Sequence, residues 1–290
     1  MRWQVGRRSE NVEDRRGAGV PRGLAIGGGS GCGLLVLVVV AMLLGVDPMA
    51  LLENIPSGGV GSGPSIEEPA DRGGAIVPSD ENSEFVAHVL GDTEDTWRAI
   101  FAQLGRQYVE PKLVLFSGMA RSACGLGQAA MGPFYCPGDE KVYIDLSFYD
   151  ELRDRFRAPG DFAQAYVIAH EVGHHVQNLL GITGQVAELR ERLNEVDGNA
   201  LSVRVELQAD CYAGVWAHHA QRSRDILEPG DLEEALGAAS AIGDDRIQRQ
   251  TQGTVVPDSF THGSSAQRVA WFRTGFSSGD IQRCDTFSSR

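Results

Sequence analysis

Positive charge is scarce over most of this 290-residue sequence, whose formal net charge is −13. Residues 1–22 hold six arginines against three acidic residues, a surplus of three positive charges, so the rest of the chain carries about −16. An acidic surface repels the phosphates of nucleic acids and anionic lipids. We therefore expect no nucleic acid as a partner, and no anionic lipid on the main part of the chain.

Pairs with Cys-x-x-Cys spacing are also absent, which argues against a zinc site built from cysteine. The five cysteines are Cys32, Cys124, Cys136, Cys211 and Cys284. The last four allow three disulfide pairings, and the sequence alone does not choose among them. Our first hypothesis pairs Cys124 with Cys136 and Cys211 with Cys284, in an oxidising compartment.

Charged residues are missing altogether from residues 23–46, and 24 uncharged residues can span a bilayer at about 1.5 Å each. Arginines precede this segment and none closely follows it, which predicts a cytoplasmic N-terminus. We expect a flexible cytoplasmic tail at residues 1–22, a single-pass anchor at 23–46, and the rest of the chain outside the cell membrane. A cleaved signal peptide is the alternative, but no Ala-x-Ala-like site follows promptly.

Residues 47–82 lack any apolar period and are rich in Gly, Ser, Pro and acidic residues, which is typical of a flexible linker. Residues 83–290 then show helical patterns separated by a few short apolar runs. We predict helices at 83–90, 92–104, 147–157, 161–180, 199–221 and 231–249, a connecting helix with Leu189, Leu193 and Val196 inward, and strands at 113–116, 134–136 and 142–146. The expected fold class is α+β, mostly helical with a small sheet.

The strongest chemical pattern is His170-Glu171-Val172-Gly173-His174. It lies in the helix expected to begin at Asp161, as N-cap, and to end before Gly181. His170 and His174 are one turn apart on one face, where their imidazoles suit a tetrahedral zinc ion. Glu171 lies one residue further round the helix, within reach of a water on the metal. This pattern predicts two zinc ligands and a general base.

A third zinc ligand has to come from elsewhere in the chain. The metzincin pattern is excluded because Gln177 and Leu180 occupy the positions that it needs as Gly and His. Glu206 and Asp210 are four residues apart on the helix at 199–221, among apolar neighbours. We predict that Glu206 completes the zinc site and that Asp210 accepts the remaining ring N–H of a ligand histidine. A solvated acidic face is the alternative.

A His-Glu-x-x-His run followed by Glu-x-x-x-Asp on a second helix resembles the gluzincin arrangement of thermolysin-type enzymes. More closely, the chain resembles a bacterial family of neutral zinc metallopeptidases, through residues 1–3, 6–17, 170–177, 206–214, 261–263 and 268–276. The resemblance implies a zincin-like fold with a substrate-binding edge strand, for which 141–146 is the candidate. It also implies a positive or hydrogen-bonding group opposite the zinc, for which His262 and Arg268 are candidates. An ordinary sheet strand and ordinary packing of the tail are the alternatives.

These patterns together predict a membrane-anchored zinc metallopeptidase. Zinc held by His170, His174 and Glu206 would activate a water, with Glu171 as the general base, and the substrate would be a peptide or protein. Two alternatives remain open at this stage. One is another zinc amidohydrolase acting on cell-wall peptide, and the other is a non-catalytic binding module stabilised by zinc.

Overall fold

The structure is a computed structural model that describes residues 1–16, 80–128 and 132–288. The predicted membrane anchor at 23–46 and all but the last three residues of the predicted linker lie outside the described residues. Among the residues that are described, no helix is both long and apolar enough to cross a bilayer.

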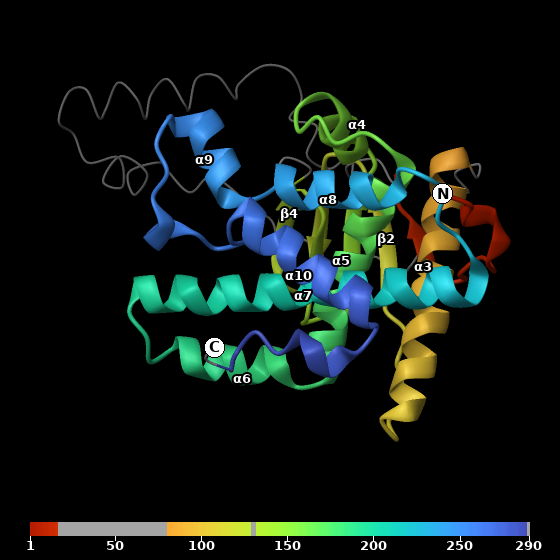
Figure 1. The fold of residues 1–290 in the computed structure, drawn as a ribbon, viewed down its shortest axis with the longest axis horizontal. Coiled ribbons are helices and arrows are strands. Elements are labelled where there is room, and N and C mark those ends of the chain that lie inside the picture. The colour runs from red at the N-terminus through yellow and green to blue at the C-terminus, as the bar shows by residue number, and fades with distance from the viewer. Residues whose placement is uncertain (17–79, 129–131, 289–290) are drawn as a thin grey trace, which may run out of the picture. The chain divides into compact units, whose positions relative to one another are not determined.

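A four-stranded sheet lies on one side of the helices, in the order β1-β2-β6-β5 (Figure 1). Its strands are β1 (Val12–Asp14), β2 (Lys112–Phe116), β5 (Phe134–Cys136) and β6 (Lys141–Asp145). β1, β2 and β6 run parallel, and β5 is antiparallel to β6, which confirms the predicted hairpin. β6 is paired on both sides. The expectation that 141–146 forms an edge strand is therefore wrong, and β5 occupies that edge.

The helices dominate the described chain, as predicted for an α+β protein with a small sheet. They are α3 (Glu81–Gln103), α4 (Ser147–Asp154), α5 (Asp161–Leu179), α6 (Ile182–Arg190), α7 (Glu195–Arg224), α8 (Asp231–Ala241), α9 (Asp244–Gln252) and α10 (Ser265–Ser278). β3 (Met119–Ser122) and β4 (Gly125–Gln128) form a separate two-stranded hairpin. α5, which carries the His-Glu-x-x-His run, packs against α3, α7 and α8.

Two helix predictions fail at glycines that permit close contacts. α3 is one helix where two were expected, on either side of Gly91. A Cβ at Gly91 would lie only 2.6 Å from the carbonyl oxygen of Arg7. Gly91 therefore gives the N-terminal segment room to pack against α3 and does not end the helix. Residues 231–249 form two helices, α8 and α9. They separate at Gly243, where a Cβ would lie 2.4 Å from the amide nitrogen of Ser265.

The connecting helix also differs from expectation. Leu189, Leu193 and Val196 were predicted to face inward, but each is 41–52% exposed. None of the residues of α6 is fully buried. The predicted connecting helix is also interrupted, because α6 ends at Arg190, Leu193 lies in the turn that follows, and Val196 belongs to α7. The exposed side of Leu189 is left uncovered because α7 contacts α6 over only a few residues.

The first 16 residues belong to the same compact unit as the helices, so the prediction of a flexible tail is wrong for them. The ammonium group of Met1 lies 2.7 Å from Asp161 Oδ1, 3.1 Å from Glu228 Oε2 and 3.4 Å from Asp231 Oδ2. Asp161 therefore pairs with a cation instead of capping α5, whose N-cap is Gly160. These charges join the chain's first residue to the start of the helix that carries the histidines.

A second set of contacts fixes the same segment to α3. The carboxylate of Glu94 has no exposed surface. Its Oε1 accepts from the hydroxyl of Ser9 at 2.6 Å and from Nδ2 of Asn11 at 2.9 Å, and Arg7 donates to its other oxygen. The next residues form β1 against β2, so residues 1–16 are an integral part of this unit.

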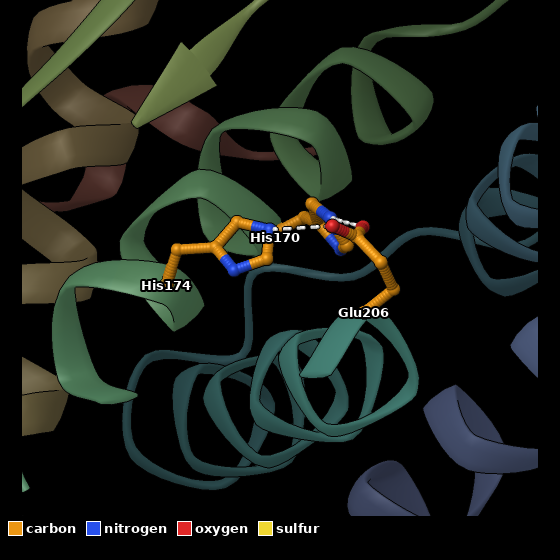
Figure 2. A group of neighbouring side chains, drawn as sticks. All are labelled: His170, His174 and Glu206. Atoms are coloured by element: carbon orange, nitrogen blue, oxygen red, sulfur yellow. Dashed lines mark hydrogen bonds and ion pairs between the residues drawn. The ribbon is translucent and has the colours of Figure 1, made fainter. Parts of the chain in front are cut away.

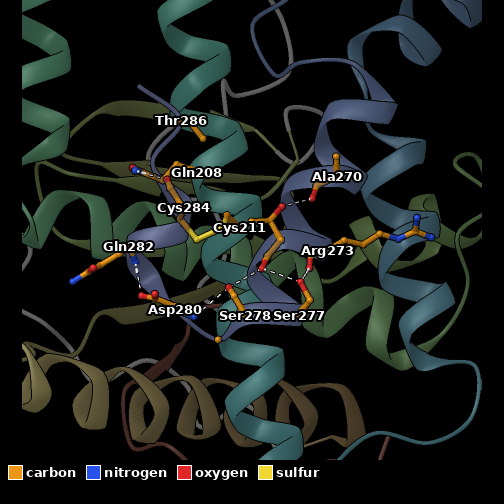
Figure 3. Close-up of a disulfide and its surroundings, with 12 residues drawn as sticks. Gln208, Cys211, Ala270, Arg273, Ser277, Ser278, Asp280, Gln282, Cys284 and Thr286 are labelled. Carbon is orange, nitrogen blue, oxygen red and sulfur yellow. Dashed lines mark hydrogen bonds between the residues drawn. A yellow bond between two sulfur atoms is a disulfide. The ribbon is translucent and has the colours of Figure 1, made fainter. Parts of the chain in front are cut away.

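Two disulfides form, Cys124–Cys136 and Cys211–Cys284, which confirms the first pairing hypothesis. The second bridge joins the middle of α7 to the C-terminal segment (Figure 3). Beside it, Nε2 of Gln208 donates to the carbonyl oxygen of Cys284 at 3.0 Å.

Candidate metal centre

The site depends on how closely α5 approaches α7. A Cβ added at Gly173 would lie 3.0 Å from the carbonyl oxygen of Ala209, so glycine inside the His-Glu-x-x-His run lets the two helix backbones meet there. Side chains within one turn of this contact on either helix then point into a shared space. The contact therefore brings Glu206 of α7 opposite the two histidines of α5.

His170, His174 and Glu206 converge in this space (Figure 2). Nε2 of His170 lies 3.2 Å from Glu206 Oε2, and Nε2 of His174 lies 3.6 Å from Glu206 Oε1. One nitrogen or oxygen atom from each residue lies within 4.8 Å of the others. Tetrahedral zinc with bonds of about 2.0 Å separates its ligand atoms by roughly 3.3 Å, so the donor set and its spacing fit zinc.

Charge within the cluster agrees with a cation site. Burial raises the pKa of Glu206, but the neighbouring imidazoles of His174 and His170 outweigh it and hold that pKa well below its usual range. Burial lowers the pKa of His174, but Glu206 outweighs burial and raises it. The carboxylate thus stays ionised in a partly buried position, which is the state in which it can bind a metal ion.

Asp210 contacts one of the two histidines, His170. Its carboxylate has no exposed surface, and Oδ1 lies 2.9 Å from Nδ1 of His170. Accepting the proton on Nδ1 leaves Nε2 of His170 with a lone pair that faces Glu206 and the metal position. Tyr166, one turn before His170 on α5, also donates its hydroxyl to Oδ1 of Asp210.

Arg268 of α10 supports the same carboxylate and is itself 2% exposed. Its Nε donates to Asp210 Oδ2 at 2.8 Å and its Nη2 to Oδ1 at 2.9 Å. Nη2 also lies 3.2 Å from the hydroxyl of Tyr166. The guanidinium is therefore close to the metal position, but its charge is paired with Asp210, behind His170. This geometry favours support of Asp210 over the expected role opposite the zinc.

Gln177 orients the second histidine, and sequence reasoning missed it. Its Oε1 lies 2.9 Å from Nδ1 of His174, and its Nε2 donates to the carbonyl oxygen of Val205 at 2.7 Å. Gln177 follows His174 by three residues and so shares its helix face. This three-residue spacing could have identified Gln177 from the sequence. In the same way, the four-residue spacing between Tyr166 and His170 could have identified Tyr166.

A cavity of about 540 Å³ opens on the metal position, and His170, Glu171, His174, Glu206 and His262 are among its lining residues. Glu171 is 7% exposed and lies on the α5 wall of this cavity. The structure thus brings the proposed general base, the three proposed ligands and both candidate oxyanion residues, His262 and Arg268, to one cavity.

His262 is held at the cavity by Asp244. Oδ1 of Asp244 lies 3.3 Å from Nδ1 of His262, and Oδ2 accepts the backbone N–H groups of Thr261, His262 and Gly263 at 2.6–3.0 Å. The hydrogen bond to Asp244 raises the pKa of His262. His262 therefore presents a polar, easily protonated side chain to the cavity.

Fold and site together define an α+β protein with a candidate metal centre of two histidines and one carboxylate, provided by two packed helices. The chain belongs to the family described as "Putative neutral zinc metallopeptidase", whose model matches residues 1–287. The family's description implies zinc, in agreement with the donor set.

Relatives extend over nearly the whole chain. It is 53% identical to "Uncharacterized protein YpfJ" of Escherichia coli K12 over 294 aligned residues, which cover 99% of both chains. It is 45% identical to "Uncharacterized protein Mb2605" of Mycobacterium bovis and to "Uncharacterized protein Rv2575" of Mycobacterium tuberculosis H37Rv, over 86% of this chain and 85% of theirs. No solved structure matches the chain significantly.

Proposed function

We propose that this protein is a zinc-dependent metallopeptidase that hydrolyses peptide bonds in peptides or proteins. The observation that carries the proposal is the convergence of His170, His174 and Glu206 at the cavity that also holds Glu171. Zinc at such a centre supplies Lewis acidity, which lowers the pKa of a bound water and polarises a carbonyl group. The family description supports the same class of reaction.

Each residue of the site has a distinct task in this proposal. Glu171 takes the proton of the attacking water and later delivers it to the leaving amine, so that the proton released in one step is used in the next. Asp210 and Gln177 fix the ring orientations of His170 and His174 through their Nδ1 atoms. His262, supported by Asp244, stabilises the negative charge that develops on the carbonyl oxygen.

The cavity also suggests how an extended substrate lies. β5 is at the edge of the four-stranded sheet, and Phe134 and Tyr135 of β5 line the cavity. An extended peptide can add to such an edge through main-chain hydrogen bonds. We propose this role for β5, in a zincin-like arrangement, in place of residues 141–146.

Replacing Glu171 with Gln tests the assignment of the base. The amide preserves shape but cannot accept the proton, so we expect a normal zinc content by metal analysis and loss of peptide hydrolysis. Glu188→Gln, on the exposed surface of α6, is the matched control and should retain activity. Unchanged turnover in the Glu171 variant would refute the base. Zinc-loaded wild-type protein that cleaves muropeptides but no ordinary peptide would identify a cell-wall amidohydrolase instead.

Membrane attachment through residues 23–46 remains part of the proposal. The predicted orientation of the chain across the membrane, however, has to agree with the pairing of β1 and β2. β1 and β2 are hydrogen-bonded neighbours, so residues 1–16 and 80–288 have to lie on the same side of any bilayer. A single span between them, with residues 1–22 inside and 83–290 outside, conflicts with this pairing. We propose that both parts share the oxidising compartment in which the two disulfides form.

Labelling with a membrane-impermeant maleimide tests this arrangement in cells. In a Cys32→Ser background, single cysteines are introduced at Glu10 or at Glu188, both of which are exposed. We expect both positions to be labelled without permeabilising the cytoplasmic membrane. Labelling of position 188 alone would show that β1 does not pair with β2 in the cell.

A further inference from the structure

The cavity extends along α5 on both sides of the metal position. Val167, His170, Glu171, His174 and Gln177 all line it, at the spacing of one helix face. α4 precedes α5 in the chain and α6 follows it, so these helices flank opposite ends of α5 (Figure 1). A chain lying along α5 therefore meets different walls on either side of the zinc ligands.

The wall toward the start of α5 is formed mainly by two phenylalanine rings, with one valine beside them. Phe148 of α4, Phe156 from the segment after it, and Val167 of α5 line the cavity there, each at most 9% exposed. The two phenylalanine rings pack together with their centroids 6.3 Å apart. This end can surround a large apolar side chain without offering it a polar partner.

The wall toward the end of α5 is formed by smaller, β-branched residues. They are Thr183 and Val186 of α6 and Val205 of α7. β-branched side chains hold few rotamers and so form a comparatively stiff surface. This end is also uncharged, although α6 and the first turn of α7 carry several acidic residues elsewhere.

Charge is confined to the centre of the cavity. Apart from the proposed ligands, Glu171, His262 and Arg268, none of the described lining residues carries a charge. Arg268 is paired with Asp210 and so is not available to a substrate carboxylate. A charged substrate side chain would therefore lose its hydration at either end without gaining an ion pair, which is unfavourable.

We propose that the enzyme selects peptide bonds flanked on both sides by apolar residues. A large aromatic or long aliphatic side chain packs against Phe148, Phe156 and Val167, and a smaller aliphatic one against Thr183, Val186 and Val205. This inference rests on the proposed peptidase function and specifies its substrate class.

Cleavage of a peptide library by the zinc-loaded full-length protein tests the preference. Burial of an apolar side chain of this size corresponds to a discrimination of roughly 10- to 150-fold. We expect kcat/KM to fall by that factor when Asp or Lys replaces the apolar residue on either side of the cleaved bond. Equal cleavage of charged and apolar sequences, or preference for a charge at either position, would overturn the inference.

A gain of specificity separates the two walls. Val186→Lys places a cation at the α6 wall and should increase the relative kcat/KM for peptides with Asp or Glu at the corresponding position by at least about tenfold. Ala187→Lys adds the same charge one residue further along α6, on an exposed position that does not line the cavity, and should leave the preference unchanged. An identical profile for both variants would refute the assignment of that wall.

Peptide binding to the zinc-loaded Glu171→Gln variant distinguishes failure of this inference from failure of the proposed function. Hydrolysis by the wild-type protein with a preference for charged residues would refute the apolar walls alone. Apolar-selective binding to the variant, with no hydrolysis by the wild type, would support the walls and refute the peptidase. Absence of both binding and hydrolysis would refute both.

Discussion

Asp210 and Glu94 are two carboxylates with no exposed surface, and the molecule uses them differently. Each lies on a helix and receives partners from distant segments. Asp210 binds Arg268, 58 residues later, and His170, 40 residues earlier. Glu94 binds Ser9 and Asn11, more than 80 residues earlier.

The difference lies in what each carboxylate orients. Asp210 fixes a side chain that faces the metal position, so its partners determine chemistry as well as stability. Glu94 fixes a backbone segment and has no contact with the metal centre among its described partners. A buried carboxylate therefore indicates that a polar or charged group from another segment packs against it. Only the identity of that group shows whether the carboxylate supports a reactive site or the fold alone.

Removing the cation beside Asp210 should have the largest effect. Arg268→Met leaves a buried carboxylate without its main counter-charge, which typically costs about 3–5 kcal/mol in the free energy of unfolding. Urea unfolding measures this loss, and zinc affinity should fall in parallel. Arg273→Met, on an exposed position of the same helix, should change stability by no more than about 0.5 kcal/mol.

A double variant sharpens this test. Asp210→Asn together with Arg268→Met removes both charges, so the stability lost should be smaller than the sum of the two single losses. Zinc affinity should nevertheless remain roughly 10- to 100-fold weaker, because the carboxylate that orients His170 is gone. Additive losses in stability would show that the pair is not coupled.

Removing the other carboxylate should have a smaller effect, confined to stability. Glu94→Ala leaves the buried hydroxyl of Ser9 without its acceptor and removes one of the two acceptors of Asn11 Nδ2, and we expect a loss of about 2–3 kcal/mol in urea unfolding. Zinc content and affinity should be unchanged in the folded protein. A change in zinc affinity comparable to that of the Asp210 variants would remove the distinction between the two carboxylates.

The smallest effect concerns His262 and Asp244. Because the folded pKa of His262 lies above its usual value, its contribution to stability is complete below a pH of about 6.5 and is lost as the pH rises through the folded pKa. The side chain is 54% exposed, so the contribution should be under about 1 kcal/mol. In His262→Asn, urea unfolding should lose this pH dependence. A wild-type stability that increases over the same interval would contradict the assigned direction.

The cluster of His170, His174 and Glu206 was predictable because its signals are local in the sequence. Residues four apart lie on one face of a helix, so their spacing can be recognised in the sequence. This holds for His170 and His174, and for Glu206 and Asp210. The hairpin of β5 and β6 followed from alternation and turn residues in the same way. Family resemblance and the expected Cys211–Cys284 bridge assigned Arg268 to the region of the site, but its pairing with Asp210 needed the structure.

Features that depend on distant segments were not predictable from periodicity. Residues 1–16 have no apolar period. Ion pairs of Met1 and the hydrogen bonds to Glu94 help to hold this segment in a defined structure. Gly91 suggested a helix end because the sequence does not show that residues 7–9 pass across it. The side of α6 that holds Leu189 was also assigned wrongly, since helical spacing defines a face but not what covers it.

The bridge between Cys211 and Cys284 has a practical consequence for handling this protein. Cys211 directly follows Asp210, and the bond closes a loop with a sequence separation of 73, worth about 4 kcal/mol in unfolded-chain entropy. Thiol reagents added during purification would weaken the helix that holds Glu206, and lost activity could then be mistaken for missing metal. Expression that allows oxidation, followed by assays free of reductant and chelator, keeps the two causes apart.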